Sequence, residues 1–328
     1  MEKIQLLEEC SAAKNIVISG HSRPDGDCVG SCMALYLYLK KALPDAQVKI
    51  CLDEPSEIYQ CIKGFDEIDT TYTVEDTVDV FIALDCEKSR LGEAETLFAN
   101  AKKRINIDHH ISNERGCGDV NYVVPGISST AELVYELMDK QYIDAEIAKA
   151  VYIGIVHDTG IFMYSNTTPK TLRIAAELIE YDFDFTAVVD ETFYEKTYTQ
   201  NQLLGRALLE SIMFMDGKCI VSVITKKTLD FYNATPKDLD GIVNQLRIIK
   251  GVECAIFMYE TGSLEYKVSL RSCNYVDVSK VATYFGGGGH VRAAGCSMNG
   301  TFHDVINNIS GQIVLQIKEY EEKQGGKG

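Results

Sequence analysis

Four short segments in the first half of this sequence carry residue types that bind divalent cations. Their candidate ligands are His21, Asp25 and Asp27, then Asp85, then Asp108, His109 and His110, and finally Asp158. A set rich in carboxylates with a few imidazoles suits Mn²⁺ best, with Mg²⁺ or Co²⁺ as alternatives, and disfavours a closed zinc site. Two such cations about 3.5–4 Å apart activate a water and neutralise phosphoryl oxygens during in-line attack. The segments therefore predict a two-metal phosphoester hydrolase.

A fifth segment, near the C-terminus, could hold a phosphate. Four glycines precede His290; they are Gly286, Gly287, Gly288 and Gly289. Consecutive backbone amides without side chains can wrap an anion. A glycine run can also be a flexible linker, but this one follows a helical pattern and precedes an apolar segment. Arg271, at the end of a predicted strand, could clamp a phosphate through two hydrogen bonds or form an exposed salt bridge.

Each metal-binding candidate has a plainer structural reading. Pro-Asp-Gly-Asp is also strong turn chemistry, and Asp85 could cap a helix. A single histidine is often structural, but three of the six histidines stand beside carboxylates here, which favours ligands. The eleven cysteines form no Cys-x-x-Cys pair, so we expect reduced core residues. Cys28 and Cys32 stand one helical turn apart beside Asp27, but their hard oxygen neighbours argue against a soft-metal site.

The first half alternates strand and helix patterns. Strands are predicted at 15–19, 47–51, 79–84 and 104–107, with a helix over 29–43. This order predicts a mostly parallel sheet covered by helices on both faces. Ligands of such sheets bind beyond the carboxyl ends of the strands. The segments at His21, Asp85 and Asp108 each follow a strand, so we expect them at one edge of the sheet.

The pattern of the second half predicts a run of helices followed by a smaller α/β domain. The expected helices are 128–139, 144–157, 168–180, 198–212, 236–248, 277–284 and 302–322, and the strands are 218–224, 253–259 and 264–270. We expect three parts: a metal-binding catalytic domain over 1–185, a helical linker over 186–212 and a substrate-binding domain over 213–328. The fold class is α/β, with the active site in the cleft between the two domains.

The distribution of charge limits the substrates. The net charge of −16 argues against binding long nucleic acid, which requires many Lys and Arg contacts. Residues 1–200 carry 18 Lys and Arg against 35 Asp and Glu, whereas residues 201–328 carry 14 against 13. We therefore expect cations in the first domain and an anionic substrate held mainly by the second. The sequence shows no membrane-length apolar run and no signal peptide, so we expect a cytoplasmic protein without a membrane partner.

The five segments, in this order and spacing, resemble the DHH phosphoesterases with a DHH-associated C-terminal domain, in the nanoRNase and pAp phosphatase group. The resemblance implies that His21, Asp25 and Asp85 hold one Mn²⁺ and that Asp27, Asp85, His109 and Asp158 hold a second. It further implies that Asp108 supports the histidine pair and that His110 contacts the scissile phosphate. Arg271, His290 and the four glycines would grip the distal phosphate or the terminal nucleotide.

The implied activity is Mn²⁺-dependent hydrolysis of very short oligonucleotides to mononucleotides, together with removal of the 3′-phosphate of 3′-phosphoadenosine 5′-phosphate (pAp). Two alternatives remain at this point. One is a phosphodiesterase for linear dinucleotides such as pApA or pGpG, which would use the same residues. The other is a nucleotide-binding sensor without catalysis, against which the complete ligand set speaks. A homodimer is compatible with the sequence.

Overall fold

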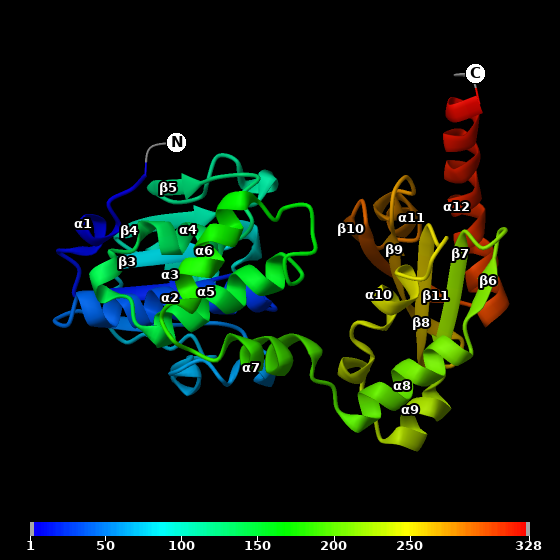
Figure 1. Cartoon of the computed structure of the whole chain (residues 1–328), viewed down its shortest axis with the longest axis horizontal. Helices are drawn as coiled ribbons and strands as arrows, with labels where there is room; N and C mark the ends of the chain where they lie inside the picture. Colours follow the sequence, from blue (N-terminus) through cyan, green and yellow to red (C-terminus); the bar gives the residue numbers. More distant parts are fainter. Residues whose placement is uncertain (1–2, 326–328) are drawn as a thin grey trace. The chain divides into compact units, whose positions relative to one another are not determined.

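The computed structural model describes residues 3–325, which form two compact units (Figure 1). The first unit ends at Glu195 and the second begins at Lys196. The predicted linker, 186–212, is therefore divided between them. Its first part, α7 (Phe185–Val189) and a π-helical turn (Asp190–Tyr194), packs on the first unit, where Thr192 Oγ1 lies 3.0 Å from His157 Nε2. Its second part, α8 (Tyr198–Leu209), packs on a strand of the second unit.

A five-stranded parallel sheet forms the centre of the first unit. Its order is β2 (Gln47–Ile50), β1 (Asn15–Ser19), β3 (Val80–Leu84), β4 (Lys103–Asp108) and β5 (Val120–Val123). Every neighbouring pair is parallel. The predicted α/β class and the four predicted strands are confirmed, and β5 is an addition.

Helices cover both faces of this sheet. They are α1 (Leu6–Cys10), α2 (Gly26–Ala42), α3 (Glu95–Asn100), α4 (Thr130–Leu137), α5 (Ala145–Asp158) and α6 (Pro169–Ile179). Ile16 and Ile18 join the core beneath α2 and α5, whereas Val17 packs with Phe81 and Phe98 on the opposite face. This alternation follows from the two-residue period of a strand. It leaves the carboxyl ends of the strands as the open edge.

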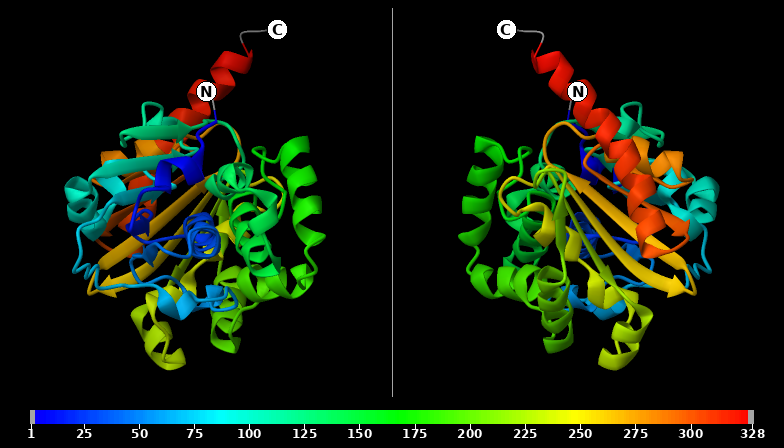
Figure 2. Two further views of the ribbon diagram at one scale, coloured as in Figure 1. Left: turned by 90° about the vertical axis from the view of Figure 1, so that its left-hand side faces the viewer. Right: turned by 90° about the vertical axis from the view of Figure 1, so that its right-hand side faces the viewer.

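The second unit is built on a mixed six-stranded sheet. Its order is β10 (Gly288–His290), β11 (Ala293–Asn299), β9 (Glu265–Ser272), β8 (Cys254–Gly262), β7 (Cys219–Ile224) and β6 (Ile212–Phe214). The long helix α12 (Phe302–Gly325) crosses one face, as the right-hand view of Figure 2 shows. The other face packs against α8, α9 (Lys226–Tyr232) and α10 (Ile242–Arg247), while α11 (Val278–Tyr284) packs beside α12.

Two predictions differ from the structure in this unit. The helix expected over 236–248 is divided into a 3₁₀ turn, Pro236–Leu239, and α10, because Gly241 adopts a φ of 86° between them. The glycine run is expected to be a loop, but its last part is strand β10, paired with β11. Within residues 3–325, no helix is both long and apolar enough to cross a bilayer.

Candidate metal centre

The ends of three adjacent strands bring the predicted ligands together. β1, β3 and β4 are neighbours, and they are followed by His21, Asp85 and His109 respectively. Two helix ends complete the set, since Asp27 lies in the first turn of α2 and Asp158 is the last residue of α5. All five side chains therefore come from chain segments that reach the same edge of the sheet.

His109 lies among three carboxylates. Its Nδ1 faces the carbonyl of Ile127 at 3.3 Å, so the proton of the neutral ring is held there and Nε2 keeps its lone pair. Three carboxylate oxygens surround that Nε2: Asp85 Oδ1 at 3.5 Å, Asp158 Oδ2 at 3.7 Å and Asp27 Oδ2 at 3.9 Å. These are separations typical of atoms that share one divalent cation.

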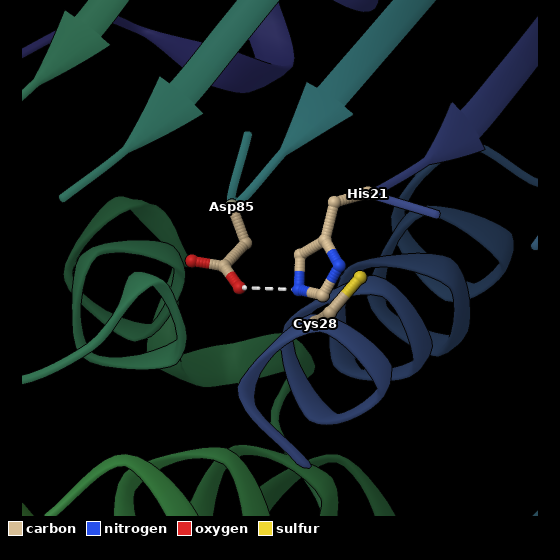
Figure 3. A group of neighbouring side chains, drawn as sticks. All are labelled: His21, Cys28 and Asp85. Atoms are coloured by element: carbon tan, nitrogen blue, oxygen red, sulfur yellow. Dashed lines mark ion pairs between the residues drawn. The ribbon is translucent and has the colours of Figure 1, made fainter. Parts of the chain in front are cut away.

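His21 forms a second group on the other side of Asp85. Its Nδ1 faces the carbonyl of Ser22 at 2.9 Å, and Nε2 lies 3.4 Å from Asp85 Oδ2 (Figure 3). That Nε2 is buried and makes no hydrogen bond among the described residues. Asp85 therefore has one oxygen toward each histidine, which is the arrangement required of a bridging ligand.

Asp25 has a different position from the other carboxylates. Its side chain is 64% exposed, and Oδ1 lies 3.7 Å from His21 Nε2. The same oxygen caps α2 by accepting hydrogen bonds from the backbone N–H groups of Asp27 and Cys28. This cap starts α2 three residues earlier than the helical pattern indicated. Asp25 is thus close to His21 and also caps the N-terminus of α2.

The electrostatics of the group indicate that it needs positive charge. Burial raises the pKa of Asp27 well above its usual value, and the charges of Asp85 and Asp158 raise it further. Burial also raises the pKa of Asp158 to about 6, although His109 opposes the shift. Burial opposes protonation of His21, but the carboxylates of Asp25 and Asp85, 3.7 and 3.4 Å from its Nε2, raise its pKa to about 11. Divalent cations would relieve this repulsion, so the residues present fit a metal centre.

Hydrogen bonds connect the carboxylates of the centre to the start of helix α4. Asp27 accepts hydrogen bonds from the backbone N–H groups of Thr130 (2.7 Å) and Ala131 (2.9 Å), at the start of α4. The Thr130 hydroxyl donates to Asp85 Oδ1 at 2.9 Å. Asp85 adopts a φ of 59°, which costs energy for a residue with a Cβ and is found at functional sites.

Asp108 positions both histidines of the Asp-His-His segment. It is fully buried, and its Oδ1 accepts from the backbone N–H groups of His109 and His110 and lies 2.7 Å from His110 Nδ1. Burial opposes ionisation, but the hydrogen bonds from His110 and Asn113 lower its pKa. The hydrogen bond to Asp108 raises the pKa of His110 despite its burial.

The asparagines that support Asp108 and Asp158 were not identified from the sequence. Asn113 Nδ2 donates to Asp108 Oδ2 at 2.7 Å and to Asn106 Oδ1 at 2.8 Å. Asn166 Nδ2 lies 3.3 Å from Asp158 Oδ2. A polar Asn106 inside the apolar strand β4 was a detectable signal, because a buried amide requires partners. The other two could be recognised only from the fold.

The predicted phosphate-binding residues lie in one row of the second sheet. Ala293 on β11 is opposite Arg271 on β9 and opposite His290 on β10. Directly paired residues share a face, so Arg271 and His290 lie on the same face with only an alanine between them. Arg271 Nε donates to Asn244 Oδ1 at 3.1 Å, and His290 is exposed.

Two of the glycines are required by close backbone approach. A Cβ on Gly287 would lie 2.2 Å from the carbonyl oxygen of Gly295, and one on Gly289 would lie 2.5 Å from that of Ala293. Arg292, two residues after His290, donates to the carbonyls of Asn274 and Val276. It therefore fixes a neighbouring turn of the second unit.

Comparison with known proteins agrees with both units. The DHH family N-terminal domain matches residues 15–155, and the DHHA1 domain matches residues 216–320. The bifunctional oligoribonuclease and PAP phosphatase NrnA of Bacillus subtilis is 28% identical, over 97% of this chain and 100% of that protein. NrnA of Thermus thermophilus is 32% identical, over 91% of this chain and 89% of that protein.

A solved structure shares the whole architecture. An exopolyphosphatase-related protein from Bacteroides fragilis superposes with a TM-score of 0.85 at 27% identity, covering 94% of each chain. The order of the domains, the ligand-rich strand ends and these matches lead to one assignment. The chain belongs to the DHH family, with a DHH domain followed by a DHHA1 domain, and it is a phosphoesterase.

Proposed function

We propose that this protein is a Mn²⁺-dependent hydrolase that degrades very short oligonucleotides to mononucleotides and also removes the 3′-phosphate of pAp. The observation that carries the proposal is the arrangement around Asp85, whose two oxygens face His21 and His109 separately. The similarity to NrnA proteins over nearly the full chain supports the choice of substrates.

The residues around Asp85 define two cation positions. His21, Asp25 and Asp85 would hold one Mn²⁺, and Asp27, Asp85, His109 and Asp158 would hold the other. When bound, the cations supply an activated water and neutralise charge on the phosphoryl group. Mg²⁺ and Co²⁺ are alternative ions for the same oxygen and nitrogen ligands.

His110 is the residue that we expect to contact the scissile phosphate. Its Nδ1–H is held by Asp108, which orients the ring and favours the protonated form. A protonated ring would present its Nε2–H to a phosphoryl oxygen and stabilise the charge that develops there. Asp108 thus acts through the histidine rather than on the substrate.

The DHHA1 domain would bind the other end of the substrate. Arg271 and His290 on one face of its sheet, and the amides of Gly286–Gly289, offer donors to a terminal phosphate or nucleotide. The acidic first unit would repel long polyanions, which favours short substrates.

All eleven cysteines lie among the described residues and none is paired, in keeping with a cytoplasmic site of action.

A hydrolysis panel with Mn²⁺ tests the proposal. It contains pAp, pApA, RNA and DNA of two to five nucleotides, a long single strand and pyrophosphate. We expect rapid cleavage of the short oligonucleotides and of pAp, and slow cleavage of the long strand. Exclusive cleavage of pApA would instead assign the enzyme to linear dinucleotides, and binding without hydrolysis of any substrate would make it a sensor.

A further inference from the structure

Cys28 lies beside the first cation position, although its hard oxygen neighbours in the sequence argued against a soft-metal site. One donor atom from each of His21, Cys28 and Asp85 falls within 4.8 Å of the other two, and all three residues are buried (Figure 3). Cys28 is in the first turn of α2, directly after the cap formed by Asp25. The thiol therefore belongs to the same helix start as Asp25 and Asp27.

The local backbone accommodates the sulfur next to His21. A Cβ on Gly20 would lie 2.2 Å from Cys28 Sγ and 3.4 Å from Cys32 Sγ, so only a glycine leaves room for the sulfur at this point. Because Gly20 directly precedes His21, this close packing keeps the thiol beside the imidazole.

A second observation, on His21, points to a cation in this group. His21 is 3% exposed, its Nδ1 is occupied by the Ser22 carbonyl, and its Nε2 makes no hydrogen bond among the described residues. An imidazole in that state presents a lone pair to a cation. The Nε2–Asp85 Oδ2 distance of 3.4 Å falls within the separation of about 3.3–3.6 Å between nitrogen and oxygen donors in a tetrahedral site with metal–ligand bonds of about 2.0–2.2 Å.

We propose that Cys28 is a further ligand of the cation held by His21 and Asp85, so that this position, while accepting Mn²⁺, binds a thiophilic divalent ion such as Co²⁺ or Zn²⁺ more tightly than its nitrogen and oxygen ligands alone would. The position of His109, surrounded by carboxylates, keeps its preference for harder ions. The centre would then bind two different metals from a mixture. The inference rests on the proposed metal centre and concerns which ion each half accepts.

Titration of the metal-free protein with Co²⁺ tests the ligand directly. A cobalt–sulfur bond produces a charge-transfer band in the near ultraviolet, whereas Co²⁺ bound by oxygen and nitrogen gives only the weaker visible bands. We expect the charge-transfer band in the wild type and in Cys32→Ser, a control one turn further along the same helix. It should be absent from both Cys28→Ser and Cys28→Ala, which should retain the visible bands.

Competition titrations provide a second readout. Cys28→Ser should weaken Zn²⁺ binding by about tenfold or more, as expected for a residue that contributes to the coordination sphere. Mn²⁺ binding should change much less. Equal weakening of both ions would overturn the proposed preference.

The outcomes separate this inference from the proposed function. Visible bands without a charge-transfer band in the wild type would overturn the cysteine ligand and leave the metal centre intact. Absence of all cobalt bands would overturn both. If the variants fail to fold, the ¹¹³Cd resonance of the wild type decides, because sulfur ligation shifts it strongly downfield of oxygen and nitrogen ligation.

Discussion

Arg271 and His290 are separated by a single residue, Ala293, in one row across three strands of the second sheet. In that row, only the small methyl group of Ala293 stands between the two basic side chains. A phosphate placed there could accept hydrogen bonds from both. Three strands, β9, β10 and β11, therefore contribute to the proposed anion site.

Ala293→Leu should fill that space and weaken substrate binding. We expect the KM for a dinucleotide to rise by about tenfold or more, equivalent to about 1.4 kcal/mol, with bound Mn²⁺ unchanged. Steady-state kinetics together with metal analysis measures both quantities. Ser297→Leu, on the same strand and the same face, is the matched control and should retain the wild-type KM. An unchanged KM in Ala293→Leu would place the phosphate elsewhere.

Asp108→Asn should impair turnover rather than substrate binding. The variant keeps the size of the side chain but loses the negative charge that orients and protonates His110. Because positioned acid and base groups contribute about 10²- to 10⁴-fold to rates, kcat should fall by at least about 10²-fold with a small change in KM. Asp119→Asn, an exposed residue beside β5, serves as the control and should turn over like the wild type. Full activity of Asp108→Asn would exclude its positioning role.

Removal of metal should destabilise the first unit. A ligand that binds only the folded state adds about 2.7 kcal/mol at a hundredfold excess over its Kd, so EDTA should lower the midpoint of thermal unfolding. Asp158→Ala removes one carboxylate beside His109 and should show a smaller difference between the Mn²⁺ and EDTA samples. If the unfolding midpoint of Asp158→Ala differs between the Mn²⁺ and EDTA samples as much as that of the wild type, Asp158 does not bind a cation.

Asp79 should give the first unit a stability that depends on pH. Its carboxylate accepts from the backbone N–H groups of Lys14 and Asn15 and pairs with Lys102 at 2.7 Å, and these bonds, that of Lys102 first, lower its pKa to about 2. A depressed pKa stabilises the fold above the unfolded value of about 3.9, and this contribution is lost as the pH falls toward 2.

The corresponding experiment is urea unfolding of Asp79→Asn. The free energy of unfolding should fall by about 1–2 kcal/mol at pH 7, and the difference from the wild type should shrink as the pH is lowered from 4 toward 2. Asp45→Asn, in an exposed turn before β2, provides a comparison without these bonds to the sheet. A difference that stays constant with pH would contradict the assignment of the effect to the ionised carboxylate.

Glu253 should be important for the fold of the second unit. Its buried carboxylate accepts hydrogen bonds from the backbone N–H groups of Asn274, Tyr275 and Val276. Glu253→Ala would leave these donors without an acceptor, so we expect a loss of about 3 kcal/mol in urea unfolding followed by circular dichroism. Glu319→Ala, exposed on α12, should have little effect. Wild-type stability of Glu253→Ala would show that water replaces the carboxylate.

The sequence predicted the first sheet well because β1, β3 and β4 are mostly buried and polar residues of unusual types stand at their ends. Ser19, Leu84 and Asp108 end three strands, and the chemistry follows directly after or at these positions. The short strands β5 and β10 were missed, and β10 consists of two glycines and a histidine, which carry no strand pattern. The glycines of β10 become a strand only because β11 supplies the partner.

Prediction of the site was limited by contacts between distant segments. Sequence spacing cannot reveal that the amides of Thr130 and Ala131 bind Asp27, about a hundred residues earlier, or that Asn166 reaches Asp158. The proximity of Cys28 to His21 depends on how closely α2 approaches Gly20. The sequence therefore identified the types of residue in the site, but not the distant amides and side chains that hold them in place.

The double use of Asp27 limits how this centre can change. One oxygen of Asp27 serves the amide of Thr130 and the other serves that of Ala131, and both must do so from a short side chain. Asparagine offers one acceptor oxygen, histidine one nitrogen, and glutamate a longer reach, so none of them replaces aspartate without rebuilding the start of α4. Altered metal preference, by mutation or by design, is therefore more accessible at neighbouring positions that carry no such structural duty.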